Sequence, residues 1–139
     1  MANDKITRGH ASQFLVASEL CRRGFPAVVT LGDTPNTDIL CSSLDGTRFA
    51  HIQVKTFRPG DRTCHVGRKA ENRFSASFLC VLCGLPEPEA GDAFLYYVIP
   101  AAIMADKVSK QHADWIAEPG RNGQQRNDSD IRVVHLPPF

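Results

Sequence analysis

An acid, an amide and an amine stand close together in two neighbouring stretches of the sequence. Asp38 opens the apolar run DILC, and Gln53 and Lys55 lie two positions apart in the run HIQVKT. Because side chains alternate across a strand, Gln53 and Lys55 would share one face. The Asp38 carboxylate, the Gln53 amide oxygen and the main-chain carbonyl of Val54 are oxygen ligands of the kind that Mg²⁺ or Mn²⁺ binds. With such an ion polarising a phosphate and Lys55 stabilising the developing charge, the pattern predicts metal-assisted phosphodiester hydrolysis.

Each of these side chains also has a purely structural interpretation. Asp38 can cap a turn, Gln53 can hydrogen-bond across a sheet, and Lys55 can extend from a strand edge into water. It is their combination that favours a site. His51 shares the expected strand face of Gln53 and Lys55, although a solvated histidine at a strand edge is the simpler interpretation.

The sequence predicts a β-scaffold that positions these residues. Residues 36–42 and 48–57 have the character of strands, and the Asp45-Gly46 turn between them predicts an antiparallel hairpin. Before the hairpin we expect a helix over about 7–23, with Thr7 as its N-cap and Gly24 at its end.

The other expected elements are a turn at 32–35, strands at 25–31, 77–84, 93–100 and 131–136, and a helix over about 101–117. The strand at 93–100 is apolar on both faces, which implies layers above and below it. This order of elements predicts an α/β fold in which helices flank a central mixed sheet.

Length and composition bound the class of protein. The 139 residues suffice for one domain, which we expect to span 1–139. With 42% hydrophobic and 22% charged residues, the composition is that of a soluble globular chain. No apolar run approaches the ~20 residues of a membrane-spanning helix, and no secretory signal opens the sequence. We therefore expect a cytoplasmic protein without a membrane segment.

The five cysteines are an odd number, as in a reduced intracellular protein. Cys80 and Cys83 have CxxC spacing, and Cys64 and His65 could complete a zinc site with them. Because the pair lies within an apolar strand, buried thiols are the favoured interpretation.

Positive charge is concentrated directly after the second strand of the hairpin. The net charge is only +1, yet the segment from Phe57 to Phe74 holds five basic and two acidic residues. The five basic residues are candidate phosphate contacts, with an ordinary solvated loop as the alternative: Arg58, Arg62, Arg68, Lys69 and Arg73.

The first helix, the run NTDIL and the run HIQVKT together resemble the core of the PD-(D/E)XK nuclease superfamily. The similarity covers residues 7–57 and is greatest to the Holliday-junction-resolvase-like and Mrr-like branches, where QxK commonly replaces ExK. It implies a restriction-endonuclease-like core in which Asp38 binds the metal, Gln53 is the second ligand and Lys55 is the catalytic lysine. It also implies DNA as the partner, Mg²⁺ or Mn²⁺ as the cofactor and a homodimer as the assembly.

The sequence departs from this family in its first helix. Gln13 stands where many relatives carry a glutamate that reaches the metal through water. Glu19, the only acid of the expected helix, lies about 120° around the axis from Gln13, and it is either a further site residue or an i,i+4 partner of Arg23. Two hypotheses remain: a metal-dependent DNA endonuclease, and a catalytically inactive nuclease-fold domain that binds nucleic acid or a partner protein.

Overall fold

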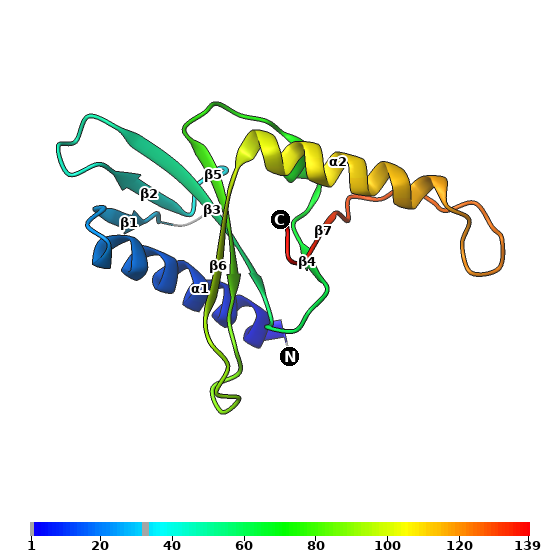
Figure 1. Ribbon diagram of the computed structural model, residues 1–139, viewed down its shortest axis with the longest axis horizontal. Helices are drawn as coiled ribbons and strands as arrows, with labels where there is room; N and C mark the ends of the chain where they lie inside the picture. The colour runs from blue at the N-terminus through cyan, green and yellow to red at the C-terminus, as the bar shows by residue number, and fades with distance from the viewer. Residues whose placement is uncertain (1, 32–33) are drawn as a thin grey trace.

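The computed structural model describes residues 2–31 and 34–139 and shows a mixed sheet between two helices (Figure 1). The expected turn at 32–35 therefore lies partly outside the described residues. The elements are, in order, α1 (Ala2–Arg22), β1 (Ala27–Val29), β2 (Ile39–Ser42), β3 (Phe49–Phe57), β4 (Thr63–His65), the 3₁₀ helix η1 (Arg68–Glu71), β5 (Phe78–Gly84), β6 (Leu95–Pro100), α2 (Ala101–Ala117) and β7 (Val133–His135). Within the described residues, no helix is both long enough and apolar enough to cross a bilayer.

The central sheet has five strands in the order β1-β2-β3-β5-β6. Only β3 and β5 are parallel, and the other neighbours are antiparallel, so the predicted mixed sheet is confirmed. The predicted hairpin is confirmed as well, because β2 pairs with β3 in the register Ile39 to Ile52. Its turn is closed by Asp45, which accepts bonds from Ser43 and Thr47, and by Gly46 at φ 72°.

The sheet separates two apolar clusters, which explains why β5 is buried along almost its whole length. Val81 and Cys83 pack with α1 on one face, whereas Cys80 and Leu82 pack with α2 and the small β4–β7 sheet on the other. The expectation that residues 93–100 are covered on both faces is wrong. This segment forms β6, an edge strand whose Val98 is 55% exposed.

Four of the five cysteines are buried and Cys21 is exposed. Cys80 and Cys83 lie on opposite faces of β5, so their sulfurs cannot bind one ion together. Burial raises the pKa of the Cys80 thiol to about 12 and that of Cys64 to about 11. Both thiols are therefore neutral core side chains at physiological pH.

The first helix is longer than expected and ends where expected. It begins at Ala2 rather than at Thr7, because the residues before Thr7 contain no helix breaker and Asp4 suits the positive end of the helix dipole. It ends in a Schellman motif: Gly24 adopts φ 92°, and Phe25 N–H donates to Leu20 O at 2.9 Å. The second helix has the predicted bounds.

Several strands are shorter than the sequence predicts, and one was missed. The strand expected at 36–42 begins only at Ile39, because Asn36 has φ 58° and cannot continue an extended ladder. The strand expected at 25–31 is limited to the three residues that β2 pairs with. The missed strand is β4, which forms its ladder with β7 from far along the chain.

Candidate active site

Asp38 lies at the entrance of β2 and is fixed against β3. Its N–H donates to Ile52 O at 2.8 Å, and its Oδ2 accepts the N–H of Val54 at 2.8 Å. The carboxylate thus accepts a hydrogen bond that a backbone carbonyl would accept if the ladder continued. It lies beside Val54, the residue between Gln53 and Lys55. The other carboxylate oxygen is not used in this bond.

The carbonyl of Val54 points to the same edge of β3 as its N–H, the edge that faces Asp38. Within a strand the N–H and C=O of one residue point to the same edge, so Val54 O lies on the edge where its N–H meets Asp38. The paired part of β2 ends at Ile39 opposite Ile52. This carbonyl therefore lies beyond the end of the β2 ladder.

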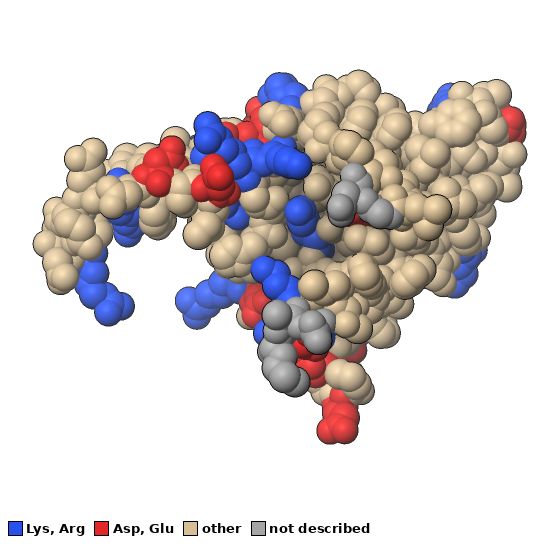
Figure 2. Space-filling view, turned by 180° about the vertical axis from the view of Figure 1, so that it is seen from behind, with Lys and Arg blue, Asp and Glu red and all other residues tan. Residues whose placement is uncertain are grey.

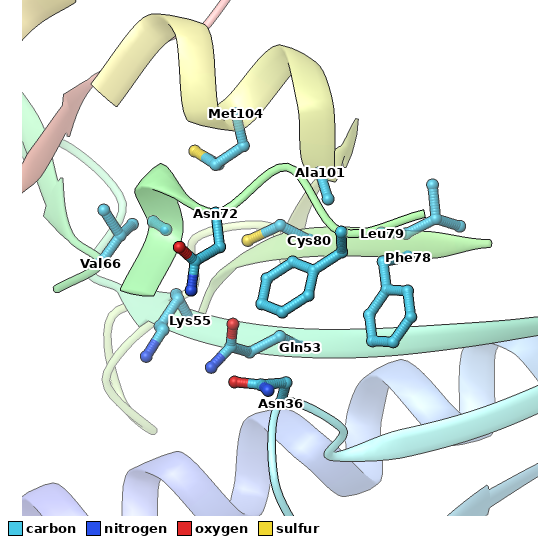
Figure 3. A pocket seen from close by; sticks show the side chains of 12 residues that line it. Asn36, Gln53, Lys55, Val66, Asn72, Phe78, Leu79, Cys80, Ala101 and Met104 are labelled. Atoms are coloured by element: carbon cyan, nitrogen blue, oxygen red, sulfur yellow. The ribbon is translucent and has the colours of Figure 1, made fainter. Parts of the chain in front are cut away.

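Gln53 and Lys55 are half-buried and lie on the α2 side of β3, because Ile52 and Val54 pack in the cluster on the α1 side. Figure 3 shows Gln53 and Lys55 together with two further carboxamides, those of Asn36 and Asn72. Four polar side chains from three parts of the chain thus meet at one hollow.

An open groove next to this hollow contains three of the predicted site residues. Asp38, Gln53 and Gln13 all line it, together with Lys69 from η1. The structure therefore brings the first helix, the start of β2 and the middle of β3 to one place. Among the described residues that line the groove, Asp38 is the one carboxylate.

Lys55 connects this hollow with a second groove, on the side of the α1 N-terminal half. That groove is lined by the basic side chains of Lys5, Arg8 and Arg58 and by the acids Asp4 and Asp61. Arg8 is held in place by Leu85 O, to which its Nη2 donates at 2.6 Å. A polyanion that contacts Lys55 can therefore also contact basic side chains in this second groove, on the side away from Asp38.

Glu19 has the structural role that the sequence left open for it. Its carboxylate binds Arg22 at 2.6 Å and Arg23 at 2.9 Å, and these bonds lower its pKa to about 2. It is not among the described residues that line either groove. The structure thus does not bring Glu19 together with Asp38, and α1 reaches the groove through Gln13 with His10 and Phe14.

The five predicted phosphate contacts have different surroundings. Arg58 is 2.9 Å from Glu87, Arg68 is 3.5 Å from Asp130, and Arg73 pairs with Asp106. All three arginines are more than half exposed, and such pairs are weak enough to exchange for a phosphate. Arg62 is exposed, and Lys69 lines the groove with Asp38. Figure 2 shows lysine and arginine side chains gathered on one face, beside the arch made by α2 and the segment after it.

Sequence reasoning missed a buried pair that fixes α1 against β3. The Thr56 hydroxyl donates to the Ser12 hydroxyl at 2.8 Å, and Ser12 is fully buried. These residues are the chain neighbours of Lys55 and Gln13, so their bond sets how the helix lies relative to the strand. The signal available in the sequence was Ser12 itself, a small polar residue between apolar positions of the first helix.

Asn36 and Asn72 were missed as well. Both lie in irregular segments, before β2 and after η1. Asn36 opens the run NTDIL but was given no role of its own, and Asn72 belongs to no recognisable motif. Only the long-range packing of η1 brings Asn72 to Gln53.

The oxygen ligands at this site suit a hard divalent ion, but only one of them carries a negative charge. Asp38, the Gln53 amide oxygen and the Val54 carbonyl are oxygen donors, which Mg²⁺ and Mn²⁺ accept. No group of three His, Cys, Asp or Glu residues that could hold a metal ion is found in the described part of the chain. A cation here would therefore depend on neutral oxygens and on the substrate phosphate to complete its shell.

The overall fold matches a solved nuclease. The structure of Hjc, a Holliday junction resolvase from the hyperthermophilic archaeon Archaeoglobus fulgidus, superposes with a TM-score of 0.54 over 95% of this chain and 87% of that chain. The chain has the restriction-endonuclease-like fold. The predicted fold class is thereby confirmed, and so, at the level of the fold, is the resemblance to PD-(D/E)XK nucleases.

The sequences of the two proteins share 13% identity, so the likeness concerns the fold. Searches against protein-family models and curated proteins find no match.

Proposed function

We propose that this protein is a metal-dependent endonuclease that hydrolyses phosphodiester bonds in DNA. One observation carries the proposal: Asp38, Gln53 and Gln13 line one groove, with Lys55 next on the same face of β3. The similarity in fold to a Holliday junction resolvase supports it. Mg²⁺ or Mn²⁺ would be held by Asp38 and Gln53 with the Val54 carbonyl.

The residues divide the chemistry between them. A bound divalent ion would neutralise the phosphate and make a coordinated water more acidic. Asp38 orients toward β3 through its bond to Val54 and leaves one oxygen for the ion. Lys55 stabilises the negative charge that develops on phosphorus. Lys69 in one groove and Arg58 in the other lie where they can contact phosphates on either side of the scissile bond.

The test is nicking of supercoiled DNA by pure protein with Mg²⁺ or Mn²⁺. Asp38→Ala and Lys55→Ala should each lose about a hundredfold or more in rate, as expected for groups that act on the transition state. Matched controls are Asp92→Ala and Lys110→Ala, which remove an exposed acid and an exposed amine elsewhere. Circular dichroism establishes that all four variants fold. Cleavage that survives both site substitutions would exclude this function.

A second function is favoured by the charge of the groove. Because Asp38 is the one carboxylate in its described lining, affinity for a divalent ion is lower than in a site with two acids. The alternative is a nuclease-fold domain that binds nucleic acid and does not cleave it. It predicts DNA binding that needs no metal and weakens steeply with salt.

We also propose that the protein forms a homodimer, because one small module covers little of a duplex. We propose the cytoplasm as the place where it acts. Light scattering on the purified protein should give twice the mass of the 15.3 kDa chain. A monomer at micromolar concentration, with and without DNA, would contradict this.

A further inference from the structure

Three aromatic rings form a stack beside the groove. Phe78 lies in the middle, 4.4 Å from the ring of His51 and 4.9 Å from the ring of Phe74, with interplanar angles of 9° and 19°. Phe74 is the most accessible of the three, with 38% of its surface exposed. The stack therefore ends in a ring that solvent can reach.

Both ends of the stack are held in place. At the inner end, His51 Nδ1 is 3.3 Å from the Thr37 hydroxyl, and Thr37 is the chain neighbour of Asp38. At the outer end, Phe74 adopts φ 52°, a conformation that is unfavourable for a bulky side chain. Packing of the ring on Phe78 offsets part of this cost. A strained backbone that presents an exposed ring next to a polar groove is typical of a functional position.

Hydrogen-bonding groups face the same hollow. Asn36, Gln53 and Asn72 bring three carboxamides together beside Lys55 (Figure 3). The apolar side chains of Phe74 and Phe78 line the same hollow. A carboxamide both donates and accepts hydrogen bonds, as the edge of a nucleobase does. The hollow itself has a volume of about 20 Å³, room for roughly one water molecule. A planar heterocycle attached to a phosphate would therefore lie over its mouth, against the exposed ring of Phe74.

We propose that Phe74, with the carboxamides of Asn36 and Asn72, binds an unpaired nucleobase of the nucleic acid held at Asp38 and Lys55. This rests on the proposed function only in that the groove must bind nucleic acid. A base inside a duplex has neighbours on both faces, so only an unpaired or extruded base can stack on Phe74. The site would thus favour DNA with an unpaired nucleotide over continuous duplex.

The experiment compares two duplexes of one sequence, each with a single 2-aminopurine that is either paired or unpaired. The wild type should bind the unpaired form about tenfold more tightly, in the range measured for one base stacked on an aromatic ring, and its fluorescence should fall on binding. Phe74→Ala and Phe74→Leu should lose the preference, whereas Phe74→Trp should keep it. Phe94→Ala, which removes another exposed ring, is the matched control.

Each outcome decides the proposal. Equal affinity of the wild type for both duplexes, or a preference that survives Phe74→Ala and Phe74→Leu, would overturn it. Metal-dependent cleavage is measured on the same duplexes. Cleavage without a preference would remove the base site and leave the proposed nuclease, whereas a preference without cleavage would keep the base site and remove the nuclease. Binding of neither duplex would contradict both.

Discussion

Gln53 determines the charge of the site, because a neutral amide stands where a second carboxylate would double the negative charge. Its amide oxygen lines the groove with Asp38, and the described lining has one carboxylate. An amide is a neutral donor, so it binds a divalent ion less strongly than a carboxylate in the same position. The side chain is half-buried, which makes the missing charge matter more than it would at a solvated surface.

Gln53→Glu should lower the concentration of Mg²⁺ or Mn²⁺ that gives half-maximal binding by about tenfold or more, because it adds a negative charge next to Asp38. Isothermal titration calorimetry with the metal alone measures this without any assay of cleavage. Gln125→Glu, a change at an exposed loop residue, is the control and should have no effect. Equal metal affinities of the two variants would show that the ion does not bind at Gln53.

The extent to which the site could be predicted follows from the range of the interactions. Asp38, Gln53 and Lys55 could be placed together because strand alternation and a short hairpin are local rules. Asn72 and Phe74 could not, because η1 is held by packing on α2 and by the bond from Arg132 to Glu71, which join residues far apart in the sequence. Glu19 was ambiguous because its arginine partners and the site are both compatible with its place on the helix.

The elements of the sheet are packed closely enough for glycine to be required at one position. Gly84 ends β5 opposite Phe57 and Leu95. A Cβ at this position would lie 2.8 Å from the Phe57 ring and 2.9 Å from Leu95 Cβ. Gly9, in the middle of α1, has the opposite surroundings, because an added Cβ would meet no atom within 4 Å.

Alanine substitutions at these two glycines should therefore have opposite signs. Gly84→Ala should lower the free energy of unfolding by about 1–3 kcal/mol through overpacking. Gly9→Ala should raise it by about 0.5–1 kcal/mol, because alanine is the better helix residue. Urea unfolding followed by circular dichroism measures both. Destabilisation by Gly9→Ala would contradict the helical packing described here.

The C-terminal end of α1 should respond to acid through Glu19. Its pKa is lowered from 4.5 to about 2 by hydrogen bonds from Arg22 and Arg23. A carboxylate with a lowered pKa in the folded state contributes stability above its unfolded pKa, and the contribution is lost as the pH falls toward the folded pKa. Wild type should thus be more stable than Glu19→Gln at pH 7, by a small amount because the pair is exposed.

The difference between these two proteins should shrink between pH 4.5 and about pH 2. Urea unfolding at a series of pH values would show it. A difference in the free energy of unfolding that stays constant over this range would mean that the ion pair does not form in solution.

At the scale of the whole molecule, the small β4–β7 sheet ties the segment of η1 to the rest of the fold. Arg132 is the central side chain: it is 4% exposed, donates to Glu71 at 2.6 Å and donates to Ser129 O at 2.6 Å. A strand was expected at 131–136, where β7 lies, but neither β4 nor the role of this buried arginine was predicted, because a three-residue strand carries little periodicity and its pairing is non-local. The large sheet, by contrast, could be predicted from its apolar runs.

Arg132→Ala should lower the free energy of unfolding by about 1–3 kcal/mol, since it removes a buried side chain together with its hydrogen bonds to Glu71, Ser129 and Ile131. It should also speed amide hydrogen exchange in residues 66–76, which contain Lys69, Asn72 and Phe74. Arg121→Ala, an exposed arginine in the segment after α2, is the control. Unchanged exchange in 66–76 would show that Arg132 does not hold this segment.

The bond between Arg132 and Glu71 also fixes the time at which the site is completed during translation. The two residues are 61 positions apart, which a ribosome takes roughly 3–12 seconds to synthesise. In that interval Asp38, Gln53 and Lys55 already exist on a growing chain, while Glu71 at the end of η1 has no Arg132 to bind it. A nascent chain therefore acquires the acid and the lysine first, and the bond that anchors η1 only after Arg132 has been made.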